Sequence, residues 1–260
     1  MLENLKIKKN NVIQKIYPTT KIFIMVMYIL STLLIGTIGK IPIGLLFWFV
    51  LLLIFVYFSG VLKEFLKSMK GIIFVALFIF ILQSLIVKGS NILFEIGFIK
   101  IYFEGVRIGT KISLMIVNIS GIFLWLFKTT EYKEITRALE EKGMSVKVSF
   151  LILSTMQMID ILNRNSKTIM NAQKSRGVET DGNILNRSKA FLPSLIPLVI
   201  SSIMNTEDRV LTLESKGFEV ECKKTHVFNI EKSGYETIAI IFSLLIFILI
   251  LIGRIILWKI

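Results

Sequence analysis

The sequence predicts an all-α integral membrane protein with about five transmembrane helices and a cytoplasmic domain of long amphipathic helices. Two observations lead to this fold class. The chain is 54% hydrophobic with a mean hydropathy of +0.73, and its apolar residues come in uncharged runs of 16 to 22 residues. A hydrocarbon core about 30 Å thick takes roughly 20 helical residues, fewer where flanking basic side chains snorkel, so each run is long enough to span it.

Five of these runs are predicted membrane spans, at residues 21–39, 42–60, 71–88, 105–127 and 236–257. They divide the chain into a four-helix transmembrane block over 1–127, a cytoplasmic domain over 128–235 and a C-terminal transmembrane helix over 236–260. The first span is not a cleavable signal peptide, because "IGTIGKIPIG" offers no small-x-small cleavage site and another span follows at once.

The distribution of basic residues predicts the orientation. Five lysines precede or open the first span, and residues 61–70 add three more against one acid. Residues 89–104 carry one lysine and two acids. The positive-inside rule therefore places the N-terminus and a predicted loop over residues 61–70 in the cytoplasm of a multi-pass cell-membrane protein, and the loop over residues 89–104 outside. This topology explains the net charge of +13, so we expect membrane lipid and no nucleic acid among the partners.

The run "AFLPSLIPLVISSIMN" is an alternative sixth span, because it is uncharged from Ala190 to Thr206. Pro193 and Pro197 interrupt its start, and Ser201, Ser202, Asn205 and Thr206 occupy its other end. In a helix, Leu195, Val199, Ser202, Thr206 and Leu213 fall near one face. That pattern favours an amphipathic helix lying against the membrane surface over a span.

Three helical units are predicted in the cytoplasmic domain. The first begins at Thr130 as N-cap, with Lys133 at N3, and ends at Gly143. The second runs over about 146–176 and stops at Gly177, and the third runs over about 194–216 and stops at Gly217. Residues 178–188 between the last two are predicted as turns.

Each of these units ends in a basic residue followed by glycine, and one explanation is ordinary helix capping. Capping does not explain the polar ends "MNAQKSRG" and "LTLESKGF", where a small or polar residue stands beside a cation. Such a tip can enter a cavity of a partner protein, where an arginine pairs with a carboxylate through two parallel hydrogen bonds. Two tips about 40 residues apart suit a partner that has two copies or two halves.

These two motifs, with the order and topology around them, resemble the transmembrane T subunit (EcfT/CbiQ-like) of energy-coupling factor (ECF) transporters. Residues 172–177, Ala-Gln-Lys-Ser-Arg-Gly, resemble the first coupling motif of that family. Residues 214–218, Glu-Ser-Lys-Gly-Phe, resemble the second, with Lys216 where the family usually has arginine. The proline-containing approach to the second motif and "TTEYKEITRALE" also resemble the family.

The resemblance implies a scaffold that joins two cytoplasmic ATP-binding-cassette ATPases to one small membrane S subunit, which captures a vitamin or a metal ion. It also implies that the two motifs contact the ATPases, with Arg176 and Lys216 as anchors. The residues assigned to this contact are Ala172, Ser175, Arg176, Gly177, Glu214, Ser215, Lys216 and Gly217.

No catalytic, cofactor-binding or metal-binding residue is predicted. The sequence has no phosphate-binding Gly-x-x-x-x-Gly-Lys-Ser/Thr loop and no His-Glu-x-x-His motif, so we expect no enzyme activity in this chain. Cys222 and His226 each stand alone as potential metal ligands. Arg107 and Lys111, near the outer end of the fourth span, are expected to snorkel to the interface.

Two other functions remain open at this point. A permease subunit of a conventional ABC transporter also contacts ATPases through coupling helices, but two tips in one chain favour the T subunit. A self-sufficient transporter or channel usually shows inverted repeats or charged pore residues, which the sequence does not show.

Overall fold

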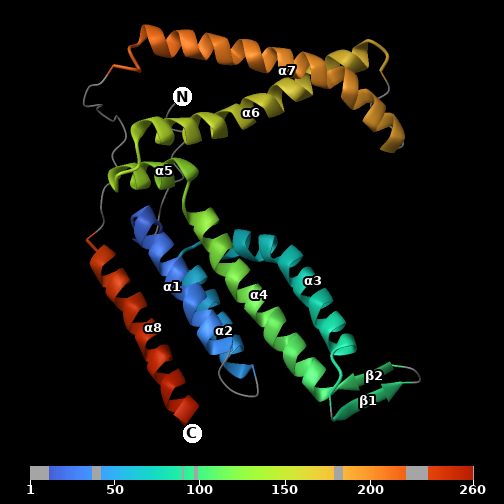
Figure 1. Ribbon diagram of the computed structural model, residues 1–260, viewed down its shortest axis with the longest axis vertical. Helices are drawn as coiled ribbons and strands as arrows, with labels where there is room; N and C mark the ends of the chain where they lie inside the picture. Colours follow the sequence, from blue (N-terminus) through green and yellow to red (C-terminus); the bar gives the residue numbers. More distant parts are fainter. Residues whose placement is uncertain are drawn as a thin grey trace. The chain divides into compact units, whose positions relative to one another are not determined.

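The computed structural model describes residues 12–36, 42–89, 91–96, 99–178, 184–220 and 234–259 (Figure 1). The chain forms two compact units. The first comprises residues 1–142 and 230–260, and the second comprises residues 143–229.

The first unit contains most of the helices and a short β-hairpin. Its elements are η2 (Val12–Lys15), α1 (Pro18–Gly36), α2 (Ile43–Phe58), α3 (Leu62–Ile86), β1 (Ile92–Ile96), β2 (Ile99–Tyr102), α4 (Phe103–Thr129), α5 (Tyr132–Glu141) and α8 (Glu236–Lys259). The antiparallel pair β1–β2 was not predicted. The second unit consists of α6 (Val146–Ser175) and α7 (Ile184–Ser215).

The all-α membrane class is confirmed. In the described residues, five helices are long and apolar enough to cross a membrane: α1, α3, α4, α6 and α8. Four of them, α1, α3, α4 and α8, correspond to predicted spans. The predicted span at 42–60 is the shorter apolar helix α2, of 16 residues. Helix α6, which is predicted from the sequence to lie in the cytoplasmic domain, also meets the criterion of length and composition because its first half is apolar and nearly uncharged.

Two boundary predictions are wrong. Residues 61–70, predicted as a charged loop, are mostly the first turns of α3, which begins at Leu62 and exposes its lysines along one side. The N-cap of α5 is Glu131 and not Thr130, because the Glu131 and Glu134 side chains form a reciprocal capping box.

Helices α3 and α4 approach each other closely because α4 carries small residues at every fourth position. A Cβ atom added to Gly105 would lie 2.9 Å from the carbonyl oxygen of Val87, and one added to Gly109 would lie 3.0 Å from that of Phe80. One turn on, the Ser113 hydroxyl donates a hydrogen bond of 2.8 Å to the carbonyl of Ala76. Small residues allow this backbone approach in membranes, where apolar burial contributes little to helix association.

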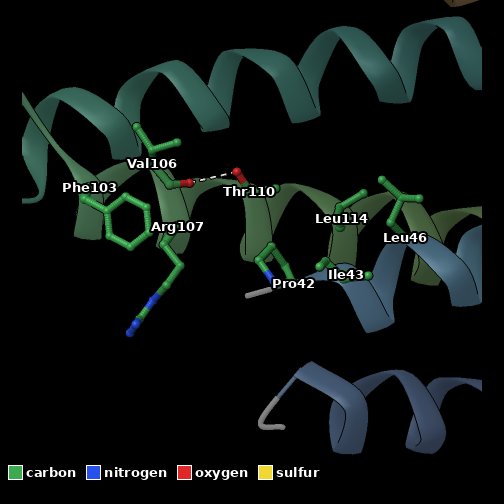
Figure 2. A pocket seen from close by; sticks show the side chains of 8 residues that line it. All are labelled: Pro42, Ile43, Leu46, Phe103, Val106, Arg107, Thr110 and Leu114. Carbon is green, nitrogen blue, oxygen red and sulfur yellow. Dashed lines mark hydrogen bonds between the residues drawn. The ribbon is translucent and has the colours of Figure 1, made fainter. Parts of the chain in front are cut away.

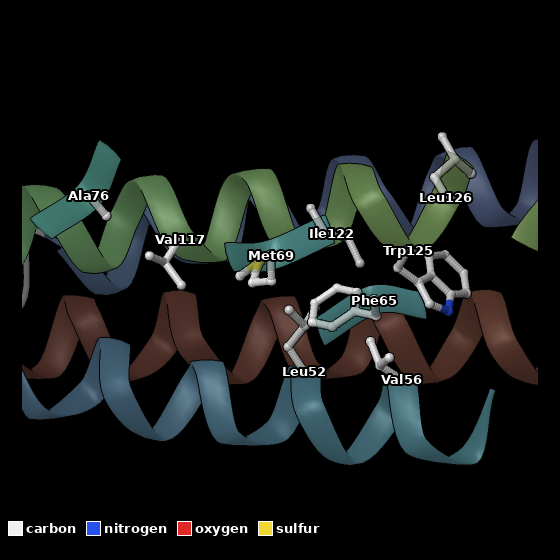
Figure 3. Packing of buried hydrophobic residues seen from close by; sticks show 9 residues of the cluster. All are labelled: Leu52, Val56, Phe65, Met69, Ala76, Val117, Ile122, Trp125 and Leu126. Carbon is white, nitrogen blue, oxygen red and sulfur yellow. The ribbon is translucent and has the colours of Figure 1, made fainter. Parts of the chain in front are cut away.

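The apolar core of the first unit lies between α2, α3 and α4 (Figure 3). It consists of Leu52, Val56, Phe65, Met69, Ala76, Val117, Ile122, Trp125 and Leu126. Outside this core the helices expose large apolar side chains, including Phe47, Phe74 and Phe78. An apolar exterior of this kind suits helices surrounded by lipid. The last helix, α8, packs along α1.

A polar network crosses the apolar interior where α1, α2 and α4 meet. The Tyr28 hydroxyl donates to Asn118 Oδ1 at 2.5 Å, and the Trp48 indole donates to Thr32 Oγ1 at 3.1 Å. The Asn118 amide also donates to the carbonyl of Leu45 at 3.2 Å. Asn118 is fully buried. These bonds therefore supply the hydrogen-bond partners that lipid cannot offer to its amide group.

The close approach of α3 and α4 yields a prediction. Gly109→Val should force the two backbones apart and cost about 1–3 kcal/mol of stability through overpacking. The control is Gly71→Val in α3, where an added Cβ meets nothing within 4 Å. Thermal unfolding of the purified protein should show a lower Tm for Gly109→Val alone. Equal Tm values for the two variants would contradict the packing account.

Candidate functional site

Helix α6 ends in a Schellman motif that carries the first predicted tip. Arg176 is the C-cap residue, and Gly177 follows with a φ of +86°, a conformation that favours glycine. The Gly177 amide donates to the carbonyl of Lys174 at 3.0 Å, and the Val178 amide donates to that of Gln173 at 3.1 Å. These two bonds define the motif and satisfy carbonyls that the helix end would otherwise leave unpaired.

Helix α7 ends in the same motif. Lys216 follows the last helical residue, and Gly217 has a φ of +66°. The Gly217 amide donates to Glu214 at 2.9 Å, and the Phe218 amide donates to Leu213 at 3.0 Å. The two tips therefore present a cation at the same position relative to a left-handed glycine.

The predicted contact residues lie on exposed surface at both tips. All eight are exposed except Gly217, which is partly buried. The two serines bond back to their own helices, from Ser175 to the carbonyl of Asn171 at 3.2 Å and from Ser215 to that of Thr212 at 2.9 Å. Within the described residues, no carboxylate forms an ion pair with Arg176 or Lys216.

The structure does not bring the two tips together, because α6 and α7 run in opposite directions. Arg209 of α7 hydrogen-bonds Ser154 near the start of α6, and Ser194 near the start of α7 contacts Met170 near the end of α6. Phe218 packs on Phe150, with ring centroids 4.7 Å apart. The tips thus lie at opposite ends of the pair, as the course of α6 and α7 in Figure 1 shows.

The length of α6 sets the distance between the tips. Phe218, two residues after Lys216, packs on Phe150 and so places the Lys216 tip near that residue of α6. From Phe150, α6 is continuous helix up to its C-cap, Arg176. At about 1.5 Å per residue, the cations are separated by about 40 Å.

Both Pro193 and Pro197 lie inside α7, because α7 begins at Ile184 and not near residue 194 as predicted. The turns predicted over 178–188 are therefore wrong from Ile184 onward, and residues 179–183 lie outside the described residues. Pro197 has no N–H to donate to the carbonyl of Pro193. The Gln173 side chain donates to that carbonyl at 3.5 Å, which connects the end of α6 to the proline segment.

The contact between α6 and α7 includes several polar side chains, and the exposed surface of α7 carries many apolar ones. Ser201 accepts hydrogen bonds from Asn165 at 3.5 Å and from Asn205 at 3.4 Å. The exposed apolar residues of α7 include Ile196, Val199, Ile200, Ile203 and Met204. Of the face predicted for this helix, Val199 and Thr206 are exposed and Leu195, Ser202 and Leu213 are partly buried. The predicted amphipathicity is present, but its apolar side is centred on other residues.

The first unit also contains a buried polar cluster, which the sequence pattern did not predict. Lys21 is fully buried, and its ammonium donates to the carbonyls of Gln14 at 2.9 Å and Thr129 at 2.8 Å. The Tyr17 hydroxyl donates to Glu141 Oε2 at 2.6 Å. Burial and this hydrogen bond raise the pKa of Tyr17, so the hydroxyl remains a donor at neutral pH.

A local signal for this cluster exists in the sequence. Pro18 is suited to the first position of a helix, which places Lys21 in the first turn, where a cation opposes the helix dipole. A cation at that position next to an apolar run indicates an acceptor elsewhere in the fold.

An apolar crevice of about 310 Å³ lies between the start of α2 and the first half of α4 (Figure 2). Its lining consists of Pro42, Ile43, Leu46, Phe103, Val106, Arg107, Thr110 and Leu114. The Thr110 hydroxyl is bonded to its own helix, at the carbonyl of Val106, and the Arg107 side chain extends away from the helices. Because the side chains that face the crevice are mainly apolar, it suits a hydrocarbon chain.

No cluster of three or more metal-ligating side chains occurs in the described part of the chain. Cys222 and His226 lie outside the described residues.

Comparison with known proteins identifies relatives over most of the chain. Residues 9–227 match the family CbiQ, described as cobalt transport protein. The chain is 33% identical over 190 residues to the energy-coupling factor transporter transmembrane protein EcfT of Bacillus subtilis (strain 168), covering 70% of this chain and 71% of the relative. It is 27% identical over 268 residues to the EcfT protein of Lactococcus lactis subsp. cremoris, covering 96% and 97%.

The tip geometry yields a prediction. Gly177→Ala should strain the left-handed position by about 1–2 kcal/mol and fray the end of α6. Hydrogen exchange of the amides at residues 176–178 should become roughly tenfold faster. The control is Gly253→Ala within α8, where an added Cβ meets nothing within 4 Å and φ is not in the left-handed region. Unchanged exchange in Gly177→Ala would mean that the motif does not hold the tip.

Proposed function

We propose that this chain, which belongs to the CbiQ family of cobalt transport proteins and is the transmembrane component of an energy-coupling factor transporter, acts as a scaffold that transmits ATP-driven motion. In this proposal its α6 and α7 tips each contact one of two cytoplasmic ATP-binding-cassette ATPases. The membrane helices hold one small S subunit that binds a vitamin or a metal ion. The chain hydrolyses no ATP itself.

The observation that carries the proposal is the pair of matching tips at opposite ends of α6 and α7. Both are held by the same two backbone hydrogen bonds, and both present a cation that has no ion pair within the described residues. A separation of about 40 Å, from the helical rise, is too large for one small cavity. It suits two separate cavities, one on each ATPase.

The chemistry of each contact follows from the side chains at the tip. The serine before each cation is small and bonds back to its own helix, so a partner backbone can approach closely. The Arg176 guanidinium would pair with a carboxylate through two hydrogen bonds, and Lys216 would make a point-charge contact. Closure of the ATPases would then displace both tips and, through α6 and α7, the rest of the chain.

The topology is part of the proposal. Residues 1–127 form the membrane block, residues 128–235 the cytoplasmic coupling domain, and residues 236–260 a final membrane helix, with the N-terminus in the cytoplasm. The positive-inside distribution of lysines supports this orientation. The exposed apolar residues of α7 are consistent with a covering of lipid or of the S subunit.

The test of this function is a mild-detergent pull-down of the tagged protein beside the double variant Arg176→Glu/Lys216→Glu. We expect the wild type to retain two ATPases and a small membrane protein, and the variant to lose the ATPases alone. The matched control is Lys147→Glu/Lys167→Glu, which makes the same charge change at exposed positions on α6. A wild-type protein that is recovered alone, or a control that loses the ATPases equally, would contradict the proposal.

Interchanging lysine and arginine at the two tips should affect ATPase binding differently. Arg176→Lys removes the planar fork and should weaken ATPase retention by about 1 kcal/mol, the scale of one hydrogen bond and roughly fivefold in affinity. Lys216→Arg, which restores the residue usual in the family, should retain the ATPases at least as well as the wild type. Titration of the immobilised protein with the purified ATPases measures both. Equal affinities for Arg176→Lys and the wild type would show that the fork is not used.

A further inference from the structure

The buried cluster around Tyr17 and Lys21 ties together the ends of four helices. Lys21 donates to Thr129, whose carbonyl lies at the end of α4 and has no partner within its own helix. Gln14 donates to the carbonyl of Ser59, the C-cap of α2, at 2.7 Å. The Trp125 indole of α4 donates to the Ser59 hydroxyl at 2.8 Å. One short segment, from η2 to the first turn of α1, therefore connects to both α2 and α4.

The bond between Tyr17 and Glu141 extends this connection to α5. Glu141 is the last residue of α5, and 124 residues separate it from Tyr17. Between α4 and α5, Thr130 and Glu131 are both extended. Two extended residues between helices form a natural hinge, at which α5 could rotate on its own. The cluster contacts the chain on both sides of this hinge, at Thr129 and at Glu141.

Helix α5 is also the only helix between α4 and α6 in the chain. A short connection, residues 142–145, joins it to α6, and Gly143 within it has a φ of +111°. Along the chain from α6, α5 is therefore the first helix of the first unit that a displacement of α6 would reach. If the α4–α5 hinge were free, that displacement would be absorbed there.

We propose that Tyr17 and Lys21 are positioning residues that fix α5 to α1, α2 and α4, so that displacement of α6 moves these helices together. This inference rests on the proposed function for the origin of the displacement. The restraint itself belongs to this chain alone and is testable without any partner.

The first experiment measures the restraint in the purified full-length chain. Tyr17→Phe keeps the ring and removes the one hydrogen bond to Glu141, and Glu141→Gln removes the charge of the acceptor. In each variant, hydrogen exchange of the α5 amides should become roughly ten- to hundredfold faster, the range for loss of a bond to a charged group. In the double variant Tyr17→Phe/Glu141→Gln, the α5 amides should exchange no faster than in the faster of the two single variants, because both changes remove the same hydrogen bond.

The matched control is Tyr57→Phe, at an exposed position on α2, which should leave exchange in α5 unchanged. Equal exchange in Tyr17→Phe and wild type, or additive effects in the double variant, would overturn the restraint. Because this experiment needs no ATPase, its failure is separate from failure of the pull-down.

The second experiment distinguishes positioning from simple stabilisation. Spin labels at Leu139→Cys in α5 and Leu30→Cys in α1, both exposed positions, are placed in a Cys222→Ser background and the complex with the ATPases is assembled. The interlabel distance should stay unchanged on adding ATP and vanadate. With Tyr17→Phe, the same addition should shift or broaden it. The positioning role would be overturned if ATP and vanadate shifted the interlabel distance in the labelled chain that keeps Tyr17, or left it unchanged in the labelled Tyr17→Phe chain.

Discussion

A lysine ammonium buried in an apolar helix bundle must keep its hydrogen bonds, because removing a charge from water costs several kcal/mol unless partners replace the water. Lys21 meets this condition with two backbone carbonyls, one in its own N-terminal segment and one at the end of α4. Both acceptors lie where helices begin or end, so the positions of α1 and α4 are fixed relative to each other. Bonds from neighbouring side chains reach α2, through Gln14 and Ser59, and α5, through Tyr17 and Glu141.

The two units differ in where their polar side chains lie. In the first, polar side chains are buried and bonded, as with Asn118 and Trp125, and small residues on α4 allow close contact with α3. In the second, the cations at the helix ends are exposed, and the same two backbone bonds cap each of those ends. Packed helices on one side and exposed tips on the other are what a scaffold between moving partners requires. The function proposed here needs both.

The sequence predicted best those features that depend on neighbouring residues. The ends of α6 and α7 were located correctly because a cation followed by glycine is a local signal for a C-cap. The start of α3 was misplaced because lysines at 63, 67 and 70 were interpreted as a loop, although residues three and four apart lie along one side of a helix. The predicted start of α7 near residue 194 follows Pro193 because proline usually marks a helix boundary, whereas the helix continues through both prolines.

The Lys21 cluster shows the limit of reading the sequence alone. The acceptor at Thr129 lies 108 residues away, and it is a backbone carbonyl, which every residue has. The anomaly of a cation in a first helical turn is visible in the sequence, but its partner is not. The opposite placement of the tips was likewise not predictable, because it depends on the antiparallel contact of α6 with α7.

The central claim is that one chain contacts two ATPases, one at each tip. Photo-crosslinking tests it most directly, with benzoylphenylalanine at Ala172 in one sample and at Glu214 in another, both exposed positions, in complexes of the full-length chain. We expect each position to crosslink to an ATPase, and a chain labelled at both positions to form a product with two ATPases. Crosslinks from only one tip, or a product limited to one ATPase, would contradict the claim.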